Sequence, residues 1–185
     1  MDIVELTEHF AIPGVLAFEQ TLSGLIYLAI TTPAAKAMVY MQGAHLASWQ
    51  PTGEAPVLFL SRKSDLVPSK PIRGGVPIAF PWFAARHDGS PGPSHGFARI
   101  QPWTLAFAAL AGGDLHLTFT LAPTQMSRNL GFDRFRLAYQ VTIGHTLTMQ
   151  LTVVNDADGP LVFEEALHTY FEVADVHETT ISGLE

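Results

Sequence analysis

Apolar and polar residues alternate in short runs along most of this chain, a pattern typical of half-buried strands in an antiparallel sheet. The alternation is clearest in residues 115–121, and it returns in residues 135–143 and 147–154. Glycines stand at the turns: Gly112 with Gly113 before the first run, and Gly144 between the other two. Glycine in these places predicts two β-hairpins.

Earlier in the chain, after a short polar lead, runs rich in β-branched and aromatic residues predict further strands. We expect them at residues 15–18, 25–30, 37–41, 44–51, 56–60 and, before the first hairpin turn, 103–110. No stretch keeps a 3.6-residue period for long, so helices should contribute little. The length of 185 residues is typical of one domain. The pattern thus predicts an all-β fold, an antiparallel β-sandwich, formed by residues 1–185 as a single domain.

The composition narrows the range of possible functions. A net charge of −7 at pH 7 would repel a phosphate backbone, which disfavours nucleic acid as a partner. The apolar runs end well short of the roughly 18 to 20 residues that a membrane span needs, so we expect no membrane segment. The first residues are acidic where a secretory signal would be basic, and cysteine is absent. We therefore expect a cytoplasmic protein without disulfides or thiolate metal sites.

Cations, glycines and aromatic rings are concentrated in residues 71–99. Proline and glycine interrupt this stretch too often for a helix and favour a rigid loop system around a concave site. Gly74 and Gly75 follow Arg73 directly, and they allow a positive φ or a close approach to a ligand, while the guanidinium offers paired donors to an anion. Residues 95–99 repeat this combination of glycine and cations. A tight turn with a solvated arginine explains either motif alone, but two such loops favour a binding site.

Residues 161–173 place polar side chains on one side of a predicted strand. With a two-residue period, Glu164, His168 and Tyr170 share one face, and the other face is mostly core. An imidazole titrates near neutral pH, so His168 suits general acid catalysis on an oxygen leaving group, although a structural histidine fits the spacing equally well. For His45, which lies in an apolar run, a hydrogen-bonded core residue is favoured over a ligand contact.

Four short motifs follow one another along the chain. They are residues 42–49 (QGAHLASW), 72–83 (IRGGVP with FPWF), 95–103 (HGFAR with a tryptophan) and 165–171 (EALHTYF). Together they resemble the hexose-6-phosphate mutarotases, the glucose-6-phosphate 1-epimerase branch of the aldose 1-epimerase superfamily, over roughly residues 38–185. The resemblance implies a galactose-mutarotase-like β-supersandwich. It also implies a hexose 6-phosphate substrate on the concave face of one large sheet, and a reaction that needs no metal or cofactor.

The resemblance further implies roles for individual residues. His168 is at the position of the family's acid, which protonates the ring oxygen of the sugar, and His95 is a second histidine near C1. The remaining implied contacts with the substrate are Arg73, Arg99, Ser94 and, as a weaker candidate for the phosphate, Arg86.

The family's general base is a glutamate, which takes the proton from the C1 hydroxyl as the ring opens. It belongs to strands that follow the matched segment, and neither Glu164 nor Glu165 matches its position. We therefore expect a sandwich that is incomplete at its C-terminus, with uncovered sheet edges that favour self-association.

Two other functions stay open. A non-catalytic sugar-phosphate-binding domain, or an inactive fragment, would keep the arginines and lack the base. A metal-dependent β-sandwich enzyme of the cupin kind would use His45, His95 and His168 as ligands, but the sequence offers no His-x-His pair or carboxylate at ligand spacing.

Overall fold

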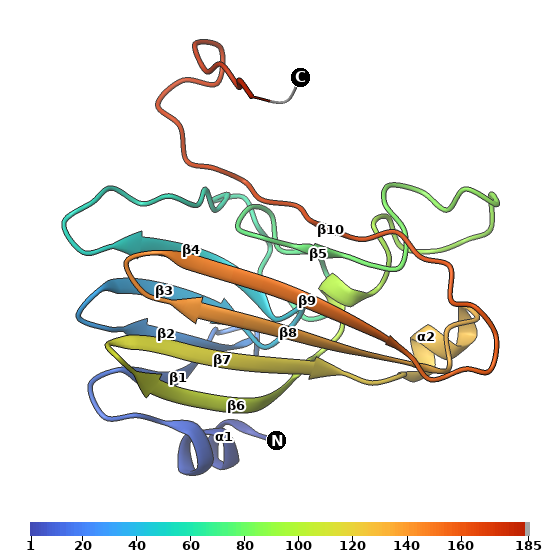
Figure 1. The fold of residues 1–185 in the computed structure, drawn as a ribbon, viewed down its shortest axis with the longest axis horizontal. Helices are drawn as coiled ribbons and strands as arrows, with labels where there is room; N and C mark the ends of the chain where they lie inside the picture. The colour runs from blue at the N-terminus through green and yellow to red at the C-terminus, as the bar shows by residue number, and fades with distance from the viewer. Residues whose placement is uncertain (184–185) are drawn as a thin grey trace.

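The computed structural model describes residues 1–183, which form two four-stranded antiparallel sheets and one small two-stranded sheet (Figure 1). The first sheet has the order β1-β2-β3-β4, with strands Leu16–Gln20, Ile26–Thr31, Ala35–Tyr40 and His45–Pro51. The second has the order β6-β7-β8-β9, with strands Thr104–Ala111, Asp114–Leu121, Phe135–Ile143 and Leu147–Asn155. The small sheet pairs β5 (Ile78–Ala79) with β10 (Ala166–Leu167).

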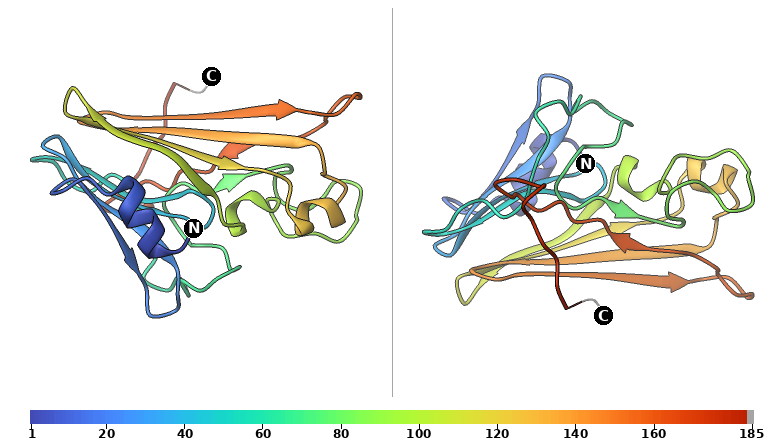
Figure 2. Two further views of the ribbon diagram at one scale, coloured as in Figure 1. Left: turned by 90° about the horizontal axis from the view of Figure 1, so that it is seen from below. Right: turned by 90° about the horizontal axis from the view of Figure 1, so that it is seen from above.

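The two larger sheets face each other, as the two views in Figure 2 show, and one hydrophobic core joins them. Leu28 and Val39 from the first sheet and Phe119 and Tyr139 from the second belong to the same cluster of buried side chains. In β7 and β8 every second residue is buried. This burial is what the two-residue period of the sequence predicts, and the antiparallel β-supersandwich is confirmed.

Most of the predicted strands form with boundaries close to those expected. Both hairpins are confirmed: β6 and β7 are joined at Gly112 and Gly113, and β8 and β9 are joined by a turn that begins at Gly144. The irregular character of residues 71–99 is confirmed as well, because that stretch contains only β5 and one short 3-10 turn, η1 (Ala98–Ile100).

Two predicted strands are wrong. Residues 56–60 make only isolated bridges, and residues 161–173 form only the two-residue β10. Their pairing partners explain both results. Gly74, opposite Leu60, has a φ of 105°, which breaks the extended backbone. Pro77, which accepts a hydrogen bond from the segment after β10, has no N–H to return.

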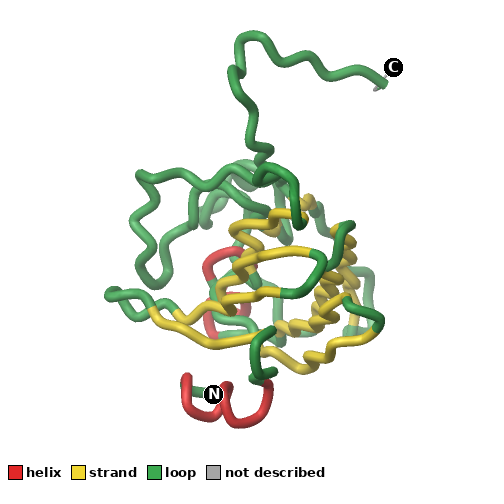
Figure 3. The backbone as a smooth tube through the Cα atoms, turned by 90° about the vertical axis from the view of Figure 1, so that its left-hand side faces the viewer, coloured by secondary structure: helices red, strands yellow, loops and turns green. Residues whose placement is uncertain are grey.

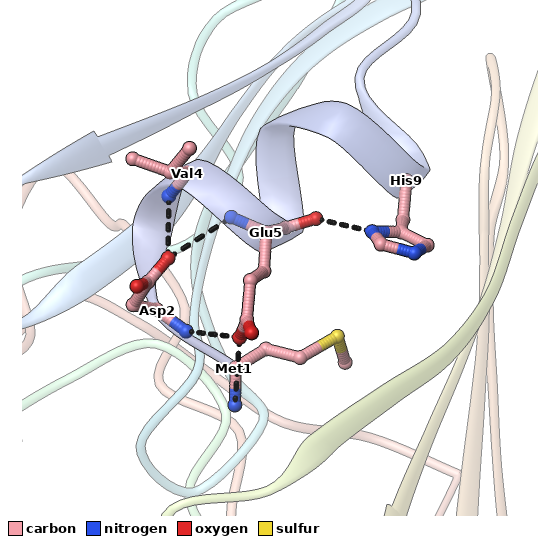
Figure 4. A network of polar contacts seen from close by, with 5 residues as sticks. All are labelled: Met1, Asp2, Val4, Glu5 and His9. Atoms are coloured by element: carbon pink, nitrogen blue, oxygen red, sulfur yellow. Dashed lines mark hydrogen bonds and ion pairs between the residues drawn. The ribbon is translucent and has the colours of Figure 1, made fainter.

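Two helices, α1 (Ile3–Phe10) and α2 (Gln125–Asn129), are not indicated by periodicity, and α1 lies in the expected polar lead. Figure 4 shows why α1 begins where it does. The Asp2 carboxylate accepts hydrogen bonds from the backbone N–H groups of Val4 and Glu5, and the Glu5 carboxylate accepts one from the Asp2 N–H. This capping box stabilises a helix that is too short to show a clear period.

The loops between β4 and β6 lie beside the sandwich, and the segment that follows β9 returns across them through β10 (Figure 1). After residue 173 the described chain is exposed and extends away from the sheets (Figure 3). Within residues 1–183, none of the helices is both long and apolar enough to cross a membrane.

Candidate functional site

A small cavity lies where the loops of residues 71–99 meet the segment that follows β10. It is lined by Pro77, Ala79, His95, Arg99, His168 and Tyr170. The rings of His95 and His168 are 5.6 Å apart between centroids, with their planes at 80°. The structure therefore brings together both predicted catalytic histidines and one of the predicted arginines, although they come from separate motifs.

The pairing of β10 with β5 positions His168. Its backbone N–H donates a hydrogen bond to the Pro77 carbonyl, 3.0 Å away, directly after the last strand residue. The imidazole lies nearly parallel to the Tyr170 ring, at a centroid distance of 4.8 Å and an angle of 23°. Of the three side chains predicted to share a face, His168 and Tyr170 lie together, whereas Glu164 does not line the cavity with them. The prediction that the opposite face lies in the core is wrong, because Phe171 is 63% exposed. The regular strand ends at Leu167, so the residues after it do not keep the alternation.

His95 sits in left-handed backbone, with a φ of 60°, and is followed by Gly96, where an added Cβ would lie 1.9 Å from the Phe80 carbonyl oxygen. The Ala84 N–H donates to Nδ1 of His95 at 3.1 Å, so the neutral ring carries its proton on Nε2. Burial, and next the nearby Arg99, lower the pKa of His95. His95 is thus suited to donate a hydrogen bond as a neutral imidazole.

Arg99 and Arg73 supply the positive charge of the site. One terminal nitrogen of Arg99 donates to the Ser94 carbonyl at 2.6 Å, while its Nε is buried without a hydrogen-bond partner in the described chain. Burial, and next the proximity of Arg73, lower the pKa of Arg99. A bound anion would relieve this repulsion and offer the guanidinium paired acceptors. Ser94 contributes to this arrangement through its backbone.

Gly74 and Gly75 hold the Arg73 loop against β4. An added Cβ at Gly75 would lie 2.3 Å from the Leu46 carbonyl oxygen and 2.8 Å from Nε2 of His45. The sequence suggested either a positive φ or a close approach to a ligand at these glycines, and the structure shows the positive φ. His45 is buried, as a core residue should be, and burial lowers its pKa to about 4, although its Nε2 has no hydrogen-bond partner among the described residues.

Arg86 lies outside this cluster. Its guanidinium pairs with Asp88 at 2.7 Å and stacks over the Trp82 ring, 5.0 Å from the ring centroid. Arg86, Asp88 and Trp82 all line a different cavity, which contains neither of the two histidines. The structure therefore does not bring Arg86 to the two histidines.

No carboxylate is present among the described residues that line the histidine cavity. Glu164 is engaged elsewhere, because it accepts a hydrogen bond from the Phe83 N–H at 2.8 Å and faces Nε2 of His87 at 2.9 Å. The Phe83 N–H and then His87 lower the pKa of Glu164. No group of three histidine, aspartate or glutamate side chains within residues 1–183 could hold a metal ion, so the cupin alternative has no ligand set.

The sequence motifs assign no role to Phe83, yet its ring contacts both histidines. The sequence places Phe83 at the end of the FPWF motif, but this position does not predict which way its ring points.

The two facing antiparallel sheets form a β-supersandwich that solved structures of mutarotase-like proteins share. A solved structure titled "putative mutarotase (YeaD)" from Salmonella typhimurium has this fold, with a TM-score of 0.80 and 36% identity, over 90% of this chain and 54% of that one. A galactose mutarotase-like protein from Clostridium acetobutylicum, at 14% identity, shares the fold with a TM-score of 0.57 over 76% of this chain and 48% of that one.

The family model described as Aldose 1-epimerase matches residues 27–185, and the chain belongs to this family of sugar isomerases. A protein of Salmonella typhimurium named "putative glucose-6-phosphate 1-epimerase" is 36% identical in an alignment that covers 97% of this chain and 61% of the relative. A protein of Escherichia coli with the same name is also 36% identical, over 95% of this chain and 60% of its own length. The chain thus spans about three fifths of these curated relatives.

Proposed function

We propose that this chain binds a hexose 6-phosphate and carries the acid half of a 1-epimerase site, which interconverts the α and β anomers of the sugar. The observation that carries the proposal is the meeting of His168, His95 and Arg99 in one cavity, with Arg73 close by. In a protein with a net charge of −7, a sugar phosphate needs such a local cluster of cations. The names of the relatives support the same class of substrate.

In the proposed reaction, His168 gives a proton to the ring oxygen as the bond from that oxygen to C1 breaks. The proton of the C1 hydroxyl goes to water, because no carboxylate is among the described residues that line the cavity. The open-chain aldehyde turns about the C1–C2 bond and recloses, and both protons return. His95 donates a hydrogen bond from Nε2 near C1, and the two arginines bind the phosphate. A positioned general acid contributes about 10² to 10⁴ in rate. Arg86 is left out of the proposed phosphate contacts, because it pairs with Asp88 and lines a different cavity.

A second candidate function is sugar-phosphate binding without catalysis. The lack of a carboxylate among the described residues of the cavity favours it, since the reaction needs a base. Calorimetric titration with glucose 6-phosphate measures binding, and NMR exchange spectroscopy measures the interconversion of its anomers. Binding with faster exchange supports the epimerase. Binding at the spontaneous exchange rate supports the second candidate, and absence of binding refutes both.

We further propose that copies of this chain associate along β9. Among the described strands, β9 pairs only with β8, and the apolar side chains of Leu147, Met149 and Phe171 lie together in a surface groove beside it. A free strand edge is a template for pairing with another chain. Light scattering after size-exclusion chromatography should show dimers that Thr152→Lys, at an exposed position of β9, converts to monomers. A monomeric wild-type chain would refute this association.

A further inference from the structure

Phe83 contacts both histidines of the site. Its ring meets the His95 ring edge-on, at a centroid distance of 4.6 Å and an angle of 75°, and lies nearly parallel to the His168 ring at 5.7 Å and 12°. The side chain is 41% exposed, so burial of apolar surface explains only part of its placement. His168 therefore has two nearly parallel aromatic neighbours, Phe83 and Tyr170.

Glu164 fixes the backbone of Phe83. One carboxylate oxygen accepts the Phe83 N–H at 2.8 Å, and the other faces Nε2 of His87 at 2.9 Å. The Glu164 N–H donates to the Pro81 carbonyl at 2.9 Å. The segment that carries His168 thus holds the loop that carries Phe83, and the Phe83 ring returns to His168 four residues further along that segment.

We propose that Phe83 is a positioning residue: with Tyr170 it fixes the plane of the His168 imidazole, and Glu164 holds Phe83 in place to do so. An imidazole turns about two side-chain bonds, whereas proton transfer requires one nitrogen within hydrogen-bond reach of the sugar oxygen. Neighbouring parallel rings oppose that rotation, because a turned imidazole would drive its edge into them. This inference rests on the proposed role of His168 as the acid.

The first test needs no catalysis. Rings stacked on an imidazole shift its proton resonances upfield, and the His168 signals are assigned by their loss in His168→Gln. In Phe83→Leu these signals should move downfield, whereas Phe83→Tyr should retain the wild-type positions. Phe107→Leu, which changes a half-exposed phenylalanine of β6 outside the cavity, is the matched control and should leave them unchanged. His168 signals that do not move in Phe83→Leu would overturn the proposal.

Kinetics of anomer exchange provide the second test. Phe83→Leu should lower kcat by about tenfold to a hundredfold with KM within about twofold of wild type, and Phe83→Tyr should restore kcat. Glu164→Ala should reproduce the fall in kcat, and Glu164→Gln, which keeps an acceptor for the Phe83 N–H, should lose less. Glu165→Ala, at the adjacent exposed position, is the matched control and should behave as wild type.

A rise in KM at unchanged kcat would assign Phe83 to substrate binding and overturn the proposal. If the wild-type chain does not accelerate exchange, the proposed epimerase function fails, while the His168 resonances still decide whether the Phe83 ring stacks on the His168 imidazole, which the positioning role requires. The two failures are therefore distinguishable.

Discussion

Replacing Gly75 with alanine tests whether the Arg73 loop is held by close backbone contact with β4. The φ of Gly75 is 62°, and an added Cβ would lie 2.3 Å from the Leu46 carbonyl oxygen and 2.8 Å from Nε2 of His45. Both distances are under 3.0 Å, closer than Cβ atoms approach other groups. Because Leu46 and His45 are buried in β4, the loop has to move instead.

The expected loss of stability has two parts. Left-handed backbone costs a residue with a Cβ about 1–2 kcal/mol. Forcing a methyl group into a packed site adds about 1–3 kcal/mol, so Gly75→Ala should lose about 2–5 kcal/mol. Gly112 is a matched control, because its φ is 63° and nothing lies within 4 Å of an added Cβ. Gly112→Ala should lose only the first part, about 1–2 kcal/mol.

Urea denaturation followed by tryptophan fluorescence gives the free energy of unfolding of both variants and of the wild-type chain. Gly75→Ala should also weaken the binding of glucose 6-phosphate in a calorimetric titration, because its loop carries Arg73, whereas Gly112→Ala should bind as the wild type does. Equal losses of stability in the two variants would refute the close-contact reasoning.

Three further outcomes are expected. His168→Ala should abolish catalysed anomer exchange, measured by NMR, and largely spare binding of glucose 6-phosphate, so a fully active variant would refute its role as the acid. Arg73→Ala should weaken that binding by a few kcal/mol at most in a calorimetric titration, whereas Lys36→Ala, at an exposed cation of β3, should not. Burial lowers the pKa of His45 from its ordinary 6.5 to about 4, so between these pH values the unfolded chain binds a proton that the folded chain excludes. The free energy of unfolding should therefore fall by about 3 kcal/mol as the pH falls through that range, at 1.36 kcal/mol per pH unit. Urea titrations of His45→Gln should show a shallower fall with pH, and an equally steep fall would contradict the role of His45.

The strands could be predicted from the sequence where alternation alone decides burial. In β7 and β8 one face must enter the core, so the period of two fixes both the strand and its orientation. The α1 helix could have been predicted from the capping residues Asp2 and Glu5, but not from its hydrophobic period, because eight residues are too few to show one. Residues 161–173 have the composition of a strand, but only two of them form one. The segments that they would pair with contain proline and glycine, which interrupt the pairing.

The residue types of the site could be predicted from the sequence, but their arrangement in space could not. His168 and His95 could be selected because imidazoles titrate near neutral pH, whereas their meeting depends on the long-range pairing of β10 with β5. Arg86 was already the weaker candidate for the phosphate, and only the structure shows that it pairs with Asp88. The proposed role of Phe83 depends on a hydrogen bond to Glu164, a carboxylate from a distant segment, which no local sequence pattern could predict.

The most direct test of the central claim is the rate of α-to-β interconversion of glucose 6-phosphate, followed by NMR exchange with and without the wild-type chain. We predict a rate above the spontaneous one, and a return to the spontaneous rate when His168→Ala replaces the wild type. A folded wild-type sample that binds glucose 6-phosphate and leaves its rate of interconversion unchanged would contradict the proposed epimerase function.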